Sequence, residues 1–159
     1  MSVVSYEIQG DIGIIWIDNP PVNALSQALR EGIHGAITGA QNDNCKALLL
    51  ICSGRTFIAG ADISEFGKPA TKPAFNEILE TIELSSKPVI AAIHGTALGG
   101  GLETALACHY RCAVKSAMVG LPEVKLGLLP GAGGTQRIPR LTGVEAAIAL
   151  MTSGTPIKA

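Results

Sequence analysis

The residue types in this sequence that could do chemistry are concentrated in one stretch, residues 90–130. A triple glycine, Gly99-Gly100-Gly101, follows a short apolar run, and Glu103 comes two residues later. A second glutamate, Glu123, follows Pro122. Backbone amides that glycine leaves accessible can bind an oxygen that gains negative charge, and carboxyl groups can transfer protons. Together these are parts from which acyl chemistry can be assembled.

A second small-residue segment, Ala59-Gly60-Ala61-Asp62, follows the apolar run 46–52 much as the three glycines follow the run 89–93. We expect each segment to lead from a strand into a helix, where the first N–H groups lack partners and the helix dipole favours negative charge. Two such junctions side by side would form an oxyanion hole. The alternative is that the glycines only permit tight packing or a turn with positive φ. No stretch has the G-x-G-x-x-G spacing of a dinucleotide site.

The two glutamates have different expected surroundings. Glu103 falls in the first turn of a predicted helix, where a glutamate can also serve only as a partner of the helix dipole. Glu123 has apolar sequence neighbours, so we expect burial to raise its pKa and suit it to proton transfer, unless it is a turn residue facing solvent. Asp62 is a candidate helix cap. The expected apolar neighbours of Glu123 are Leu121, Val124, Leu126 and Leu128.

The pattern along the chain predicts an α/β fold with parallel crossovers. We expect a β-hairpin over 3–8 and 12–17, followed by a helix that Ser26 caps and that runs to about Gln41. The run 46–52 is typical of a strand covered on both faces. Further strands are expected at 89–93, 111–114 and 118–121, and a surface loop is expected at 67–73. Helices are expected at 74–85 and 102–109. A last helical stretch is expected to begin at 135, to be interrupted at Pro139 and to resume over 143–151.

Composition excludes several classes of protein. The 159 residues are 47% hydrophobic and 16% charged, which argues against disorder and fits one domain, residues 1–159. Without any long basic block, a nucleic-acid surface is not expected. The apolar runs are too short to cross a membrane, and the N-terminus does not resemble a signal peptide, so the expected location is cytoplasmic. The four cysteines, Cys45, Cys52, Cys108 and Cys112, are expected to be buried free thiols rather than metal ligands.

Four segments, 19–25, 57–63, 94–103 and 120–137, occur in an order that resembles the enoyl-CoA hydratase/isomerase family, also called the crotonase family. The likeness is greatest to the N-terminal part of multifunctional enzymes of fatty-acid β-oxidation. It implies a crotonase-like spiral of β-β-α units and a substrate carried as a coenzyme A thioester. It also implies that the chemistry needs no metal or cofactor, and that the location is peroxisomal if the source is eukaryotic.

The resemblance implies roles for particular residues. Ala61 and Gly100 match the two oxyanion-hole positions, and Glu103 and Glu123 match the two catalytic glutamates. Having both glutamates favours hydration of 2-enoyl-CoA. A Δ3-Δ2-enoyl-CoA isomerase, which requires only the Glu123 position, and a catalytically inactive acyl-CoA-binding fragment are the alternatives. The implied substrate-binding positions are Ala59, Asp62, Ile63, Gly99, Pro130 and Gly131.

Two features depart from the family pattern. Ser64 stands where many relatives have a basic residue near the coenzyme A phosphates. Family members also continue past the position of Ala159 with helices that complete the acyl pocket. We therefore expect residues 1–159 to be the core of a longer chain without those C-terminal helices, and to form a homo-oligomer or to be fused to a downstream dehydrogenase domain.

Overall fold

The computed structural model describes residues 2–69 and 71–159, so position 70 of the predicted loop 67–73 lies outside the described residues. The helices are α1 (Gln27–Ala40), α2 (Phe75–Glu83), α3 (Gly100–Ala107), α4 (Gly134–Thr142) and α5 (Val144–Ser153), with 3-10 turns η1 (Ile63–Glu65) and η2 (Pro122–Leu126). The strands are β1 (Val4–Gln9), β2 (Ile12–Ile17), β3 (Ala47–Cys52), β4 (Val89–Ile93), β5 (Thr96–Leu98), β6 (Tyr110–Ala113), β7 (Met118–Gly120) and β8 (Ile157–Lys158).

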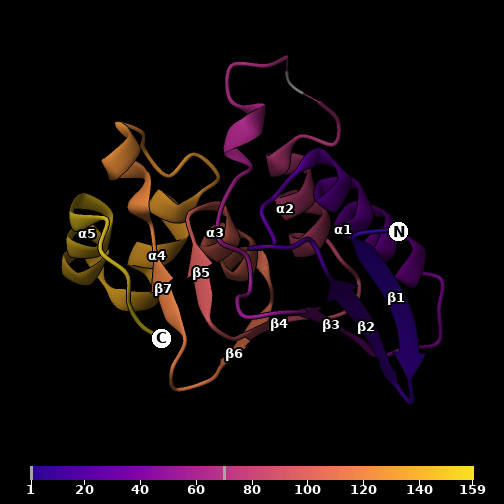
Figure 1. Cartoon of the computed structure of the whole chain (residues 1–159). Coiled ribbons are helices and arrows are strands. Elements are labelled where there is room, and N and C mark those ends of the chain that lie inside the picture. The colour runs from indigo at the N-terminus through magenta and orange to yellow at the C-terminus, as the bar shows by residue number, and fades with distance from the viewer. Residues whose placement is uncertain (1, 70) are drawn as a thin grey trace.

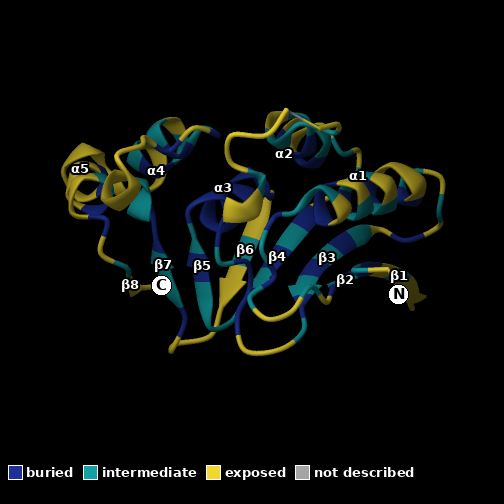
Figure 2. Cartoon of the chain, turned by 45° about the horizontal axis from the view of Figure 1, so that its top comes forward, coloured by how far each residue is buried: buried dark blue, intermediate teal, exposed yellow. Residues whose placement is uncertain are grey.

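Two sheets organise the chain (Figure 1). The first has the strand order β1-β2-β3-β4-β6, with an antiparallel β1–β2 hairpin and parallel pairing from β2 to β6. The second has the order β5-β7-β8. Helices α1 and α2 lie over one face of the larger sheet, and α4 and α5 lie beside β7 near the C-terminus (Figure 2). The predicted α/β fold with parallel crossovers is confirmed.

Local signals in the sequence account for most elements. Ser26 caps α1, because its Oγ accepts the N–H of Leu29, and the helix buries Leu29, Ile33 and Ile37 along one stripe. The same side chains join the main hydrophobic core, together with residues of β3 and β4. No helix of the described residues is long and apolar enough to cross a membrane.

Helix α3 lies at the centre of the fold, with α4 on one side and α2 on the other (Figure 2). All eight of its residues are buried, and it packs against α2, α4 and β5. A helix that is buried all round carries little periodic polar pattern, so its sequence gives few clues to its exact ends. It begins at Gly100, two residues before the predicted start at Leu102.

Three predictions about the fold are wrong in part. Strand β3 buries one face, and its other face, with Leu49 and Ile51, is only half-buried. Helix α4 continues through Pro139, because proline removes only one N–H and the Pro139 carbonyl still accepts the N–H of Gly143. Cys112 is exposed on the edge strand β6, whereas the other three cysteines are buried as predicted. Strands β5 and β8, of three and two residues, were not predicted.

Candidate active site

The first predicted junction, Ala59-Gly60-Ala61-Asp62, pairs through its backbone with Leu25. The Leu25 N–H donates to the carbonyl of Gly60 (2.9 Å), and Leu25 and Ala61 form an isolated parallel bridge. Asp62 is a cap as predicted, with Oδ1 accepting the N–H of Ser64 (2.9 Å), and the hydrogen bonds from Ser64 lower its pKa. The element that it caps is only the three-residue turn η1. The predicted helix dipole behind Ala61 is therefore absent, since one 3-10 turn aligns too few peptide units.

The second junction is a true helix start. Gly99 caps α3 with φ +52° and ψ −126°, a conformation that L side chains rarely adopt. Gly100 is the first residue of the helix, and the Glu103 N–H closes the first turn onto the Gly99 carbonyl (2.9 Å). Here the predicted combination of a glycine opening and an α-helix dipole is present.

Leu25 and the segment around Ile58 bring the two junctions together. The Leu98 N–H donates to the Ile58 carbonyl (3.1 Å), and a Cβ on Gly101 would overlap the same oxygen. A Cβ on Gly100 would stand 3.0 Å from the Leu25 side chain. Leu25 thus borders both Ala61 and Gly100. Within residues 2–69 and 71–159, the N–H groups of Ala61 and Gly100 donate to no protein acceptor, which leaves both free for a ligand oxygen.

Glu103 is buried and held by a distant loop. Only 2% of the residue is exposed, and its Oε1 accepts the N–H groups of Ala132 (2.8 Å) and Gly134 (2.9 Å). Two amide donors fix one carboxylate oxygen in position and direction, as charge-assisted hydrogen bonds do. Glu103 is therefore more than a partner of the helix dipole, because its carboxylate is oriented from outside its own helix.

Glu123 belongs to η2, and its side chain lies next to the start of helix α3. It is half-buried in η2, and a Cβ on Gly99 would stand 3.1 Å from its Oε1. Its Oε2 is the one buried side-chain oxygen or nitrogen of the described residues without a hydrogen-bond partner. Burial raises the pKa of Glu123, and the nearby charge of Glu103 raises it further. The carboxyl group of Glu103 is therefore close enough to influence the ionisation of Glu123.

The raised pKa of Glu123 and its cause, burial, were predicted, but most of the apolar neighbours that were expected to bury it are exposed. Of the expected apolar residues only Leu121 is buried, while Val124, Leu126 and Leu128 are exposed. These three side chains are exposed, whereas the carboxyl group of Glu123 faces the start of α3 at Gly99.

The remaining predicted positions surround these groups unevenly. Gly99 and Pro130 are buried, Ala59 and Asp62 are half-buried, and Ile63 and Gly131 are exposed. Pro130 lies against Gly134, whose N–H binds Glu103. The prediction missed Ala132 and Gly134 as residues that orient Glu103, although both lie in the segment 120–137 that carries the resemblance.

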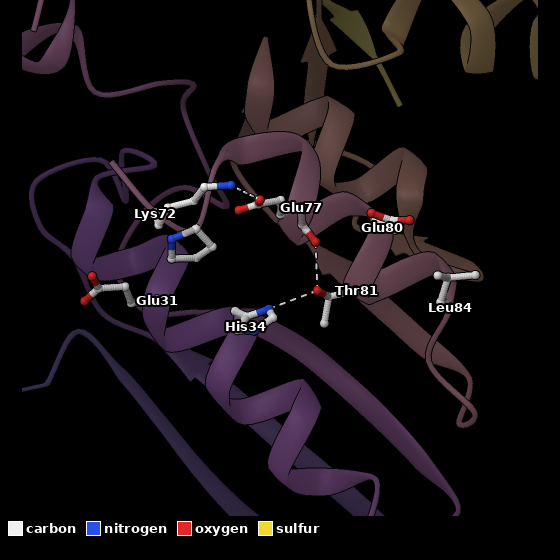
Figure 3. A pocket seen from close by; sticks show the side chains of 8 residues that line it. Glu31, His34, Lys72, Glu77, Glu80, Thr81 and Leu84 are labelled. Atoms are coloured by element: carbon white, nitrogen blue, oxygen red, sulfur yellow. Dashed lines mark hydrogen bonds and ion pairs between the residues drawn. The ribbon is translucent and has the colours of Figure 1, made fainter. Parts of the chain in front are cut away.

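A separate hollow lies between α1 and α2 and contains none of the predicted site residues (Figure 3). Its lining includes Glu31, His34 and Lys72, and the His34 Nδ1 is hydrogen-bonded to Thr81 Oγ1 at 2.9 Å. Lys72 pairs with Glu77 on the same rim. Within residues 2–69 and 71–159, no group of three or more His, Cys, Asp or Glu side chains is arranged to hold a metal ion.

Comparisons with known proteins assign this chain to a family. The family model "Enoyl-CoA hydratase/isomerase" matches residues 7–159. The chain belongs to the enoyl-CoA hydratase/isomerase family. Members of this family act on coenzyme A thioesters, and the fold described above is the crotonase fold with its β-β-α units.

Three similar proteins illustrate the range of the family. The peroxisomal bifunctional enzyme of Danio rerio is 49% identical over 96% of this chain and 21% of its own length. The glyoxysomal fatty acid beta-oxidation multifunctional protein MFP-a of Cucumis sativus is 42% identical over 92% of this chain and 22% of its own. The crystal structure of an enoyl-CoA hydratase from Bacillus anthracis superposes with a TM-score of 0.91 at 37% identity, covering 99% of this chain and 65% of that one. The chain thus spans about a fifth of the two multifunctional relatives.

Proposed function

We propose that this protein adds water across the double bond of 2-enoyl-CoA thioesters, as an enoyl-CoA hydratase of fatty-acid β-oxidation. The observation that carries the proposal is the pair of carboxyl groups at α3, of which Glu103 belongs to the helix and Glu123 belongs to η2. Glu103 is oriented by two amides, and Glu123 lies against the helix start with one oxygen unpaired. The unpaired N–H of Gly100 lies at the same helix start.

The two free amides supply the electrophilic half of the reaction. When the thioester carbonyl lies between the N–H groups of Ala61 and Gly100, negative charge that develops on its oxygen is stabilised. One donor of this kind contributes about 3–4 kcal/mol to lowering a barrier. The coenzyme A portion contributes binding energy that orients the acyl chain for reaction.

The two carboxyl groups supply the water and the protons. Glu103 and Glu123 hold the water between them, its oxygen adds to Cβ of the substrate, and Glu123 delivers a proton to Cα. The proton that the water loses passes to the carboxyl pair and replaces the one that Glu123 delivered. The hydroxyl and the hydrogen of one water are thereby added across one double bond, with no redox change. A raised pKa suits Glu123 to this role, because its carboxyl holds a proton nearer to neutral pH than an ordinary glutamate.

Isomerisation of 3-enoyl-CoA to 2-enoyl-CoA is a second candidate. The unpaired Oε2 of Glu123 favours it, because one carboxyl that removes and returns a proton is sufficient for that reaction. Glu103 has no part in it. The oriented Glu103 is therefore the feature that favours hydration over isomerisation alone.

The wider assignments follow from the same proposal. The substrate is an acyl group on coenzyme A, and the steps above require neither a metal nor a redox cofactor. Residues 1–159 act as the hydratase/isomerase core, next to a dehydrogenase domain or in a homo-oligomer. The names of the relatives support a peroxisomal location if the source is eukaryotic.

The test follows the absorbance of the conjugated thioester when the protein is mixed with a short 2-enoyl-CoA. We expect the absorbance to fall, and to fall at least a hundredfold more slowly in Glu123→Gln. An unchanged rate in Glu123→Gln contradicts the assignment. Offering a 3-enoyl-CoA and seeing the absorbance rise identifies the isomerase. Binding of the thioester by calorimetry without either reaction identifies a binding fragment.

A further inference from the structure

Arg137 connects the loop 131–133, which binds Glu103, to helix α2. Its Nη1 donates to the carbonyl of Ala132 (2.7 Å), and its Nε donates to Glu83 Oε1 (2.8 Å), which also pairs with Nη2. Glu83 is the last residue of α2, and Arg137 is in α4. The two side chains lie on the rim of a hollow between α2 and the loop 131–133.

The contacted carbonyl belongs to the central one of three successive peptide groups. The peptide groups on either side carry the N–H of Ala132 and the N–H of Gly134, and both N–H groups bind Glu103 Oε1. The central group shares one Cα with each of the two donor groups, so a contact that fixes the central group also helps to fix the positions of both donors. Arg137 therefore acts on the orientation of Glu103 without touching it.

Gly133 allows the guanidinium to lie against the backbone here. Its φ is +91°, and a Cβ at this position would overlap Arg137 Nη1. The close approach is thus specific to this loop, since a side chain at Gly133 would displace the arginine. The Arg137 N–H also donates to the Gly133 carbonyl (2.9 Å), which begins α4 at the loop.

We propose that Arg137, braced by Glu83, is a positioning residue for the water-activating carboxylate Glu103. The inference rests on the proposed hydratase function and refines it. In this scheme α2 determines through the Glu83–Arg137 pair how Glu103 is presented to water, while Glu123 and the two oxyanion amides are held by other contacts. Loss of Arg137 weakens hydration and leaves proton transfer at Cα.

The experiment compares Arg137→Met, which removes the donors at similar length, with Arg137→Lys, which keeps one donor. We expect kcat for hydration to fall at least tenfold in Arg137→Met and less in Arg137→Lys, because a misplacement of about 1 Å can cost on the order of a hundredfold. KM is expected to change by less than about threefold, since displacing Glu103 removes a contact made in the transition state.

A second readout separates positioning from general damage. Exchange of the Cα hydrogens of a saturated acyl-CoA with D2O requires Glu123 and the oxyanion amides but no added water. We expect Arg137→Met to lower exchange much less than hydration. The matched control is Arg140→Met, because Arg140 is exposed on the same helix and, among the described residues, its side chain bonds to Gln136 alone. This control is expected to retain the wild-type rates.

The possible results test the hydratase function and the role of Arg137 separately. If the wild type does not hydrate 2-enoyl-CoA, the proposed function fails. If the wild type hydrates and Arg137→Met stays within twofold of it, the positioning role of Arg137 is wrong. An equal loss of hydration and exchange in both Arg137 variants also overturns that role, since it indicates a structural defect shared by the whole site.

Discussion

The carboxyl group of Glu123 lies directly against the backbone of Gly99, so close that a methyl group on Gly99 would stand 3.1 Å from Oε1. The two residues are 24 positions apart in sequence and belong to different elements, η2 and the cap of α3. Because Gly99 also has φ +52°, both its conformation and its surroundings favour glycine. The contact places the proposed proton donor beside the proposed oxyanion amide of Gly100.

Replacing Gly99 by alanine is expected to damage both stability and activity. The strained φ costs about 1–3 kcal/mol of unfolding free energy, and the methyl group displaces Glu123 from the helix start. Hydration is expected to fall at least tenfold, since Glu123 moves away from the substrate. Urea unfolding and the absorbance assay measure the two effects.

The matched control for this change is Gly10→Ala. Gly10 has φ +60° and open space around it, so the variant carries the backbone strain without the contact. We expect a loss of stability and a wild-type rate of hydration. Equal activity losses in the two variants would contradict a specific role for the Gly99–Glu123 contact.

Gly101→Ala is expected to destabilise the fold although it improves helix propensity. An alanine gains about 1 kcal/mol in a helix, but overlap with the Ile58 carbonyl costs on the order of 3 kcal/mol, because a backbone oxygen cannot move aside cheaply. In Gly35→Ala, an exposed site on α1 with nothing within 4 Å, the propensity gain acts alone. Thermal unfolding should therefore show opposite signs for the two variants, and a shared sign would refute the packing argument.

The raised pKa of Glu123 makes part of the stability dependent on pH. Burial raises its pKa above the ordinary value of 4.5, so the folded protein binds more protons than the unfolded chain between the two pKa values. Stability therefore falls as the pH rises through that window, by linkage. Glu123→Gln removes the ionisation, and we expect its stability relative to wild type to be greater at pH 8 than at pH 4.5. Urea unfolding at both values checks this, and a pH-independent difference would count against it.

Asn23 is expected to be a major stabilising residue of the segment 19–25. It is buried, its Nδ2 donates to the carbonyls of Ser53 (3.0 Å) and Thr56 (2.9 Å), and its Oδ1 accepts the Asn19 N–H (2.8 Å). Asn23→Ala leaves these groups unpaired and strains a residue at φ +53°, for a loss of about 3 kcal/mol.

Two further variants separate the two causes in Asn23→Ala. Asn23→Gly tolerates the positive φ, so it retains only the loss of hydrogen bonds, and Asn42→Ala on the exposed surface is the control. Equilibrium unfolding should rank Asn23→Ala as the least stable of the three. A loss below about 1 kcal/mol in Asn23→Ala would show that the buried hydrogen bonds contribute little.

Local patterns predicted the elements that carry local signals. The hairpin over β1 and β2, the capped helix α1 and the strands β3 and β4 were predicted within one or two residues. Strands β5 and β8 were missed because elements of two or three residues show no periodicity. The break predicted at Pro139 did not occur, since burial of Ile138 and the tertiary contacts of α4 offset the loss of one N–H.

In the site, too, some features were predictable from local sequence and others depended on tertiary contacts. The types of its residues were predictable, because two glutamates and two glycine-rich segments lie in four motifs of a family. Their orientation was not, since Ala132 and Gly134 bind Glu103 from about 30 positions away and Glu123 lies against the distant Gly99. Arg137 lies in the segment 120–137, but the sequence assigned it no role, because no local rule connects it to Glu103.

The sequence by itself determined which chemical groups this protein has and the family to which it belongs, because residue types, spacing and short-range propensity are properties of the chain alone. Only the tertiary structure decided that Ala61 and Gly100 border one leucine, that Glu103 is held by a loop, and that the Glu123 carboxyl group lies against Gly99. The physical reason is that burial and hydrogen-bond geometry depend on which distant segments come into contact, and a local sequence pattern does not specify those contacts.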